Sequence, residues 1–166
     1  MKTALCLIFF CTIQITVFCQ AGSKDSSFGN NGVVISNFVN QAHAYAVAVQ
    51  SNNKIVVAET TATSNNNDFA LTRYNEDGST DSTFGINGKI LTDFNHFQDE
   101  ILDVAIQPDG KILAAGESNS GSSYDFAIVR YKAKGVLDNT FGNNGKVTTD
   151  FSSTQDIGYA MALQTD

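Results

Sequence analysis

The sequence predicts an all-β fold made of antiparallel four-stranded repeats of about 57 residues, and three observations support it. A Phe-Gly-X-Asn-Gly motif begins at Phe28, Phe84 and Phe141. An Asp-Phe-Ala motif that leads into Arg-Tyr begins at Asp68 and again at Asp125. Short apolar segments alternate with Gly, Asn, Asp and Pro turn residues, without helical periodicity. Two motifs that keep one spacing indicate a single supersecondary unit copied along the chain.

Four short strands are predicted in each copy and are clearest in the second. A first strand over residues 89–94 follows the Asn-Gly turn, and a second spans residues 101–107. A Pro-Asp-Gly turn then leads to a third strand over 111–116, and the fourth strand covers 125–131. Gly and Asp tolerate the positive φ angles of tight turns, so these residues separate consecutive strands.

The second strand of each copy carries large residues on one face and mostly small residues on the other. In the first copy Tyr45, Val47 and Val49 form the large face, and Ala46 and Ala48 lie opposite. Successive side chains point to opposite faces of a strand, so both faces are expected to be covered, at unequal distances. No segment is left for covering helices, which favours sheets stacked face to face around an axis, as in a β-propeller. The large faces of the other copies are Leu102, Val104 and Ile106, and Tyr159, Met161 and Leu163.

These motifs resemble a known family. The segments Asp-Ser-Thr-Phe-Gly-X-Asn-Gly-Lys from Asp81, Val-Ala-Ile-Gln-Pro-Asp-Gly-Lys-Ile from Val104 and Asp-Phe-Ala-Ile-Val-Arg-Tyr from Asp125 are similar to the delta-60 repeat family, predicted β-propeller domains of unknown function. The resemblance covers essentially the whole chain after the first 19 residues. The first copy departs from the pattern, with Ser-Asn-Asn-Lys at 51–54 where Gln-Pro-Asp-Gly-Lys is expected. The resemblance implies a propeller and supplies no activity.

The chain divides into an export signal and a repeat region. Residues 1–19 combine an early lysine, an apolar stretch and small residues near the end, which is typical of a secretory signal peptide. Residues 20–166 form the propeller-type region, with copies over about 28–83, 84–140 and, incompletely, 141–166. We expect a secreted or cell-surface protein, with no membrane span in the mature chain.

The number of repeats leaves two interpretations open. Closed propellers use about 4 to 8 blades, and this sequence holds about two and a half repeats. We favour a fragment of a longer protein, because the sequence ends inside a repeat. The alternative is self-association of several copies through unpaired blade edges.

Charge and cysteine content exclude some classes of protein. The sequence has 17 acidic and 10 basic residues and a net charge of -7, so no basic patch is expected and nucleic acid is not a predicted partner. All three cysteines, Cys6, Cys11 and Cys19, lie in the signal segment. The mature repeats must therefore be stable without disulfides.

The strongest metal candidate is the loop that contains Asn75, Asp77 and Asp81. Oxygen ligands at alternate positions before a glycine, followed by an acid, resemble the calcium loops of some propellers and part of an EF-hand loop. The alternative is an Asx-type turn that closes a hairpin. Lys132 and Lys134 take the ligand positions in the next copy, so calcium is not expected in every repeat. No other cofactor is predicted.

Repeated acids precede each Phe-Gly pair. Asp25, Asp81 and Asp138 could be interpreted as a catalytic ring, but an acid present in every copy is better explained as an acceptor of backbone N–H groups in the turn. The same reasoning applies to Arg73 and Arg130, which are expected to pair locally with a carboxylate.

Residues that break the repeat are the other candidates. His43 and His96 lie in polar segments before the second strands and carry only a weak functional signal. Asp103 stands where the other copies have Ala46 and Ala160, so it could face a central channel or be hydrated there.

The predicted function is that of a binding or structural scaffold without a catalytic site in this chain. The variable stretches 60–67 and 118–124 are rich in Ser, Asn and Thr, which suits hydrogen bonding to a glycan or an extracellular protein. The alternative is part of a propeller enzyme, a hydrolase or lyase whose site needs further blades; Asp103 is its single candidate member.

Overall fold

A computed structural model describes residues 22–36, 38, 41–64, 66–94, 96–152 and 155–164. These residues form two antiparallel sheets of four strands each and no helix, which confirms the predicted all-β class. None of the described residues belongs to a helix long and apolar enough to cross a membrane. The predicted signal segment, 1–19, lies outside the described residues.

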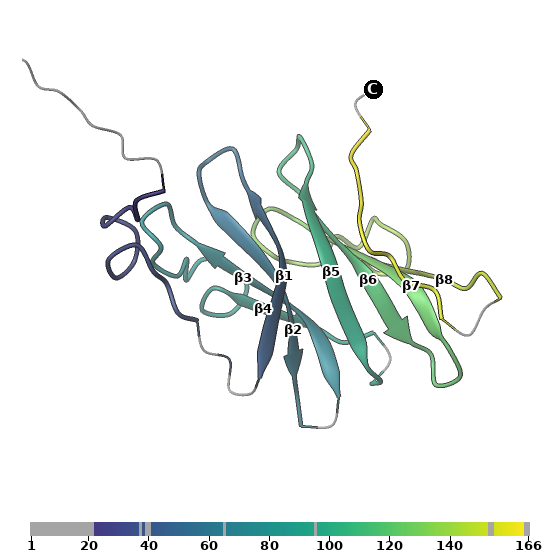
Figure 1. Ribbon diagram of the computed structural model, residues 1–166. Helices are drawn as coiled ribbons and strands as arrows, with labels where there is room; N and C mark the ends of the chain where they lie inside the picture. The colour runs from purple at the N-terminus through teal and green to yellow at the C-terminus, as the bar shows by residue number, and fades with distance from the viewer. Residues whose placement is uncertain are drawn as a thin grey trace, which may run out of the picture.

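Each sheet is a meander in which neighbours in the chain are neighbours in space (Figure 1). Strand bounds agree with the sequence prediction to within a few residues. The first sheet contains β1 (Ala42–Val49), β2 (Ile55–Ala62), β3 (Asn67–Tyr74) and β4 (Lys89–Thr92). The second contains β5 (Asp99–Ile106), β6 (Ile112–Asn119), β7 (Tyr124–Tyr131) and β8 (Lys146–Thr149).

The sheets are out of phase with the sequence repeat by one strand. β4 follows the second Phe-Gly motif, so the sequence grouped it with β5, β6 and β7, yet it pairs with β3, with Leu71 opposite Ile90. The grouping of strand 89–94 with the second sheet is thus corrected. The Phe-Gly turn brings the chain back beside the open edge of β3, whose backbone N–H and C=O groups need partners. Every sheet is therefore completed by the strand that opens the next repeat.

The second sheet packs across the face of the first through β5, which contacts β1, β2 and β3 (Figure 1). The large face of β5 points toward the first sheet, and Val104 is 6% exposed. The equivalent Val47 in β1 is 63% exposed, because no sheet among the described residues covers that face. Val104 and Ile106 pack on the core as the predicted alternation requires, but Ile101, predicted on the opposite face, is buried in the same cluster, because the alternation is interrupted by the register shift between Ile101 and Asp103.

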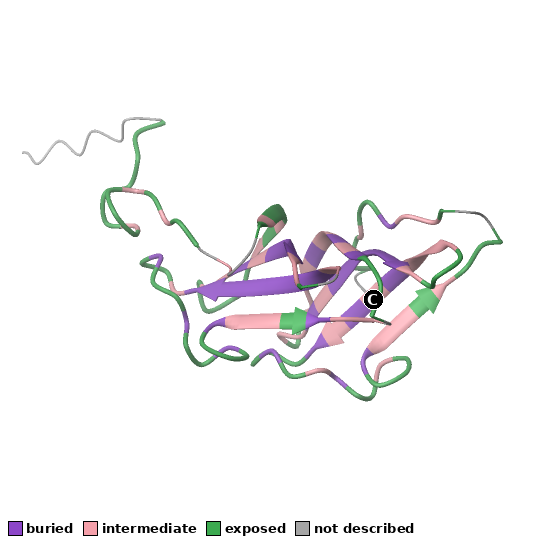
Figure 2. Ribbon diagram, turned by 90° about the horizontal axis from the view of Figure 1, so that it is seen from below, coloured by how far each residue is buried: buried purple, intermediate pink, exposed green. Residues whose placement is uncertain are grey.

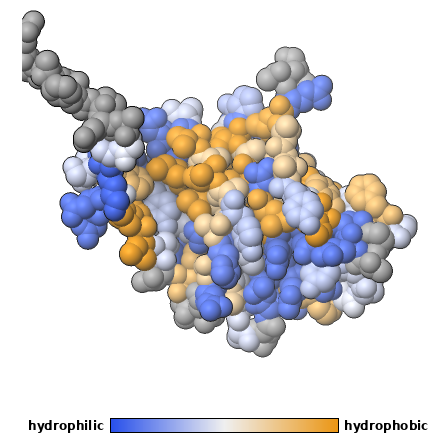
Figure 3. Space-filling model, in the orientation of Figure 1, coloured by the Kyte–Doolittle hydropathy of each residue, from blue (hydrophilic) through white to orange (hydrophobic). Residues whose placement is uncertain are grey.

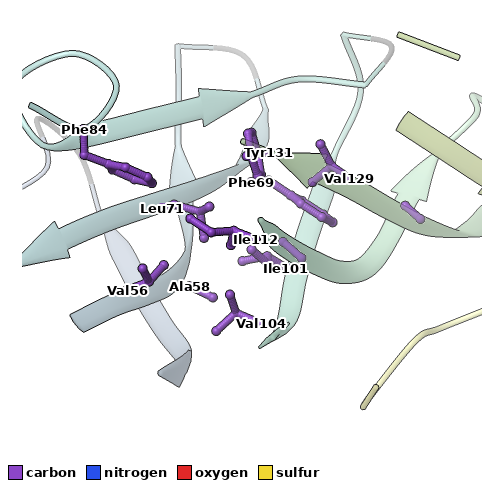
Figure 4. Packing of buried hydrophobic residues seen from close by; sticks show 12 residues of the cluster. Val56, Ala58, Phe69, Leu71, Phe84, Ile101, Val104, Ile112, Val129 and Tyr131 are labelled. Carbon is purple, nitrogen blue, oxygen red and sulfur yellow. The ribbon is translucent and has the colours of Figure 1, made fainter. Parts of the chain in front are cut away.

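The core is a continuous cluster between the two sheets (Figures 2 and 4). β3 is buried over nearly its whole length, since β2 and β4 flank it and β5 covers it. Figure 4 shows that side chains from both sheets contribute to this cluster. Its buried members are Val56, Ala58, Phe69, Leu71, Phe84, Ile101, Val104, Ile112, Ala114, Ala127, Val129 and Tyr131.

A bulge in β5 helps to join the sheets. The register with β6 shifts between Ile101 and Asp103, as it does between Ala44 and Ala46 in β1. A bulge frees a backbone group from its ladder. The N–H of Ile101 donates to Oγ1 of Thr60 in the first sheet, at 3.1 Å.

The third copy differs from the prediction of a second strand around Tyr159. Residues 156–164 are extended but form no strand, and Tyr159 is 72% exposed. This segment lies beside the second sheet, where the N–H of Gly158 donates to the carbonyl oxygen of Gly116 at 3.2 Å.

The turns of both sheets gather at two ends. The acidic end is defined by residues 63–64, 66, 93–94, 96–98 and 120–123, and the Phe-Gly end by 75–88 and 132–145. The variable stretches predicted from the sequence, 60–67 and 118–124, form shorter turns than expected, because residues at both of their ends belong to strands. In Figure 3 hydrophobic residues gather over the upper part of β1 and β5, whereas the lower part of this face is mainly hydrophilic.

Candidate functional site

The acidic end holds a cluster of three aspartates from three strand ends. Asp68 lies in β3, Asp93 follows β4, and Asp99 is the first residue of β5. One carboxylate oxygen of each lies within 4.8 Å of the others. Because β3 and β4 belong to the first sheet and β5 to the second, the cluster lies at the junction of two blades.

The cluster recurs 57 positions later. Asp125 in β7, Asp150 after β8 and Asp156 in the third copy meet within the same 4.8 Å limit. We call these two sets the first and second Asp triads. The second triad joins the second sheet to the segment that continues from it, so its place in the repeat matches that of the first.

A conserved local geometry within the chain positions the triads. The sequence Asp-Phe-X-X-X-Gln-Asp occurs at 93–99 and at 150–156. The N–H of Phe94 donates to Oδ2 of Asp99 at 2.8 Å, and that of Phe151 donates to Oδ2 of Asp156 at 2.7 Å. The last aspartate of each segment therefore closes its own loop and keeps its other oxygen for different partners.

Two members of the first triad are buried, and the third, Asp93, is half-buried. Asp99 is fully buried and Asp68 is 7% exposed. Oδ1 of Asp68 and Oδ1 of Asp99 have no hydrogen-bond partner among the described residues. A buried carboxylate oxygen without a partner is costly, because it has lost its hydration without replacement.

The electrostatics of the first triad favour loss of negative charge. The pKa of Asp99 is raised to about 6, chiefly by burial and also by the nearby carboxylates of Asp93 and Asp68, against the opposing effect of the Ser118 hydroxyl and the Phe94 N–H. Burial, followed by the charge of Asp93, also raises the pKa of Asp68. His96, whose side chain is 95% exposed, places Nδ1 2.6 Å from Oδ2 of Asp93.

The predicted metal loop at the Phe-Gly end has a different arrangement. Nζ of Lys54 lies 2.7 Å from Oδ1 of Asn75 and 2.9 Å from Oδ2 of Asp81, so an ammonium group joins two of the three candidate ligands. Asp77 uses Oδ1 to accept from the N–H and hydroxyl of Ser79, at 2.9 and 2.6 Å. This loop has the geometry of an Asx turn, the alternative that the sequence also allowed.

The loop also contacts the Phe-Gly turn that opens its own copy. The N–H of Gly29 donates to the carbonyl oxygen of Asp77 at 2.8 Å, and the N–H of Gly85 donates to that of Lys134 at 3.2 Å. The turn that closes each of these two copies therefore contacts the Phe-Gly turn at the start of the same copy.

The acids before the Phe-Gly pairs accept turn N–H groups, as expected. Oδ1 of Asp81 accepts from the N–H of Thr83 at 3.1 Å, and Oδ1 of Asp138 accepts from that of Thr140 at 3.3 Å. Asp25 accepts from the N–H of Ser27 at 2.9 Å. The predicted local pairing of the arginines is also confirmed, with Arg73 on Asp81 and Arg130 on Asp138.

The residues that break the repeat lie apart from one another in the sequence and in their contacts. His43 is exposed in β1, and His96 lies beside Asp93 with a positive φ of 64°. Asp103 is half-buried at the bulge of β5. Its Oδ1 accepts from the N–H of Val104 at 2.8 Å and its Oδ2 from that of Met161 at 2.6 Å, so it contacts the third copy.

Sequence reasoning did not identify the Asp triads. Their signal was present, since Asp68 and Asp125 opened a recognised motif and Asp-Phe-X-X-X-Gln-Asp occurs twice. The residues of one triad span two repeats, so no local window contains all three.

Comparison with known families agrees with the fold. Residues 50–84 and 107–141 each match the model of a domain of unknown function, DUF5122, described as a beta-propeller. Both matches run from the turn before β2 or β6 to the phenylalanine of the next Phe-Gly pair. A search of the curated proteins found no match. The chain therefore carries repeated blades similar to a β-propeller domain of unknown function.

Proposed function

We propose that this chain is the blade region of an exported β-propeller of the delta-60 repeat type, which acts as a binding scaffold for a glycan or an extracellular protein. The repeated sheets supply a rigid frame, and the turns at the acidic end present side chains from both blades. Export is supported by the composition of residues 1–19.

The observation that favours binding is an exposed aromatic ring held between turns of both sheets. Phe97 is 45% exposed, and its carbonyl oxygen accepts from Nδ2 of Asn66 at 2.5 Å. Gly121 lies against the ring, where an added Cβ would be 3.2 Å from it. The hydroxyl of Tyr124 donates to Oε1 of Gln98 at 3.3 Å. We call these five residues the Phe97 surface.

The chemistry of the Phe97 surface suits recognition. Aromatic rings are enriched at binding interfaces, and amide and hydroxyl groups beside them give orientation through hydrogen bonds. A ring that is half-exposed but fixed by neighbouring turns loses little side-chain entropy on binding. A glycan or a polar loop of another protein would meet both features.

A glycan array with the purified chain, run beside a panel of hydrolase substrates, tests this function. We expect binding to a defined class of glycans, weakened about tenfold or more by Phe97→Ser. Ile86→Ser is the matched control, since Ile86 is also an exposed apolar residue but lies at the Phe-Gly end. Equal weakening by both variants would argue against the Phe97 surface, and turnover of a substrate would favour the enzyme alternative.

A further inference from the structure

We propose that the two Asp triads are binding sites for divalent cations that prefer oxygen ligands, with Ca²⁺ the best match, and that each bound ion joins two consecutive blades. The proposal concerns the acidic end and is independent of the loop that contains Asn75. It rests on unpartnered buried oxygens, on charge, on size and on recurrence.

The buried oxygens supply the first argument. Asp68 and Asp99 are both more than nine-tenths buried, and each has an Oδ1 without a hydrogen-bond partner among the described residues. Both belong to the set of carboxylates that meet within 4.8 Å. Buried carboxylate oxygens that lack a hydrogen-bond partner within such a cluster are groups that a bound cation would satisfy.

Charge supplies the second argument. Within the described part of the chain, no Lys or Arg forms an ion pair with a carboxylate of the first triad. Lys146 comes near, but its Nζ donates to the backbone carbonyl oxygen of Asp93 at 2.5 Å. Nδ1 of the exposed His96 imidazole lies 2.6 Å from Oδ2 of Asp93. Three acids with so little compensation attract a divalent ion.

Size is compatible with Ca²⁺. Ca–O distances of about 2.3–2.6 Å place ligands on opposite sides of the ion about 5 Å apart. The candidate ligand oxygens of each triad all lie within 4.8 Å of one another, so they fit inside such a coordination sphere. Ca²⁺ also accepts irregular geometry and further carbonyl or water ligands, which a site at a loop can provide.

Recurrence supplies the fourth argument. The second triad places aspartates at the same three positions, and its loop is closed by the same hydrogen bond to a phenylalanine N–H. A feature that recurs at two junctions suits a structural task shared by those junctions. The first copy has Ala42 at the position equivalent to Asp99, at the start of β1, so the motif is a property of particular junctions.

The role of the ion follows from where its ligands originate. Asp68 and Asp93 are carried by β3 and the end of β4, and Asp99 by β5. An ion held by all three would fix the spacing of the two sheets at the acidic end. The backbone hydrogen bond from Ile101 to Thr60 joins the same pair of sheets further along β5.

Calorimetric titration of the chelator-treated full chain with CaCl₂, together with thermal unfolding, tests the proposal. We expect two ions per chain, one for each triad, and an unfolding temperature that rises with calcium concentration. Asp99→Asn should abolish one site and Asp156→Asn the other, and the double variant should bind no ion. Loss of a residue that only supports a metal ligand typically weakens metal affinity about 10–100-fold. Loss of a direct ligand should therefore weaken calcium binding at its site at least as much.

Two further variants keep the test decisive. Asp93→Asn removes a half-buried ligand outside a strand and replaces Asp99→Asn if that variant does not fold. Asp77→Asn is the matched control in the loop at the Phe-Gly end, and it should leave both sites unchanged. Absence of calcium binding at millimolar concentration, or loss of a site in Asp77→Asn with both triad variants unaffected, would overturn the proposal.

Discussion

Arg73 and Asp81 form a buried ion pair in which Nε and Nη2 of the arginine both contact Oδ2 of the aspartate at 2.8 Å. The guanidinium also lies over the ring of Phe84, 4.3 Å from its centroid. Arg130, Asp138 and Phe141 repeat this set, with the guanidinium 4.5 Å from the ring centroid. The pair thus explains why Arg-Tyr and Asp-X-X-Phe-Gly recur together in the sequence.

Asp81→Asn should lower the free energy of unfolding by about 3–5 kcal/mol, because it leaves a buried guanidinium without its charge partner. Arg73 and Asp81 are each only 4% exposed. Asp138→Asn should cost less, since its partner Arg130 is 19% exposed and therefore partly hydrated. Urea unfolding of the two variants measures the difference, and equal losses would contradict the role of burial.

The same carboxylate should make stability depend on pH below neutrality. Burial alone would raise the pKa of Asp81, but hydrogen bonds from Thr83 and Lys54 and the charge of Arg73 outweigh it and hold the pKa well below its usual range. A lowered pKa in the folded state gives stability that is complete above the unfolded pKa, about 3.9, and is lost as pH falls toward the folded pKa. Urea midpoints between about pH 7 and pH 3 should fall more for the wild type than for Asp81→Asn. Parallel curves would show that Asp81 does not contribute.

Val104→Ala should destabilise the chain by about 2 kcal/mol, because it removes two methyl groups from the contact between the sheets and leaves a cavity. Val47→Ala changes the equivalent residue of β1, which is exposed, and should alter stability by less than about 0.5 kcal/mol. Thermal unfolding of the pair tests whether the sheets pack through β5. Similar effects of both substitutions would contradict that packing.

Gly85→Ala should be more harmful than Gly110→Ala, although both glycines have positive φ, 53° and 81°. A Cβ at Gly85 would lie 2.2 Å from the carbonyl oxygen of Lys89, whereas at Gly110 the nearest atom would be 3.6 Å away. Backbone strain costs about 1–3 kcal/mol at either position, and the clash at Gly85 adds to it. Unfolding curves should therefore rank Gly85→Ala clearly below Gly110→Ala, and the reverse order would disprove the close approach.

The sequence predicted the parts of the fold that depend on local pattern. Alternation in segments such as 101–107 and the turn residues between them located the strands, because strand direction and face depend on neighbours in the chain. The phase of the sheets was not predictable in this way. Whether β4 joins β3 or β5 depends on which edge lies open in space, and its four residues, Lys89–Thr92, carry no signal for either choice.

The candidate site was also not predictable from local sequence pattern. Asp68 and Asp99 belong to different copies and are separated by the turn at the Phe-Gly end and by β4, and each alone looks like an ordinary acid at a strand end. The loop with Asn75 was the more visible metal pattern, but Lys54 reaches it from the β1–β2 turn. Spacing in the sequence indicates only which residues can meet within one loop. Each triad instead brings together residues from three separate segments of the chain.

The staggered sheets have a consequence for how such a chain can grow. Because the fourth strand of each sheet comes from the following copy, a duplication or deletion of one whole period reconstitutes every strand pairing, wherever in the period its ends fall. The number of blades can thus change by such events without leaving an additional sheet edge unpaired. In a complete ring of this kind, strands from the two ends of the chain would have to pair in one sheet. The hydrogen bonds of that sheet would close the ring.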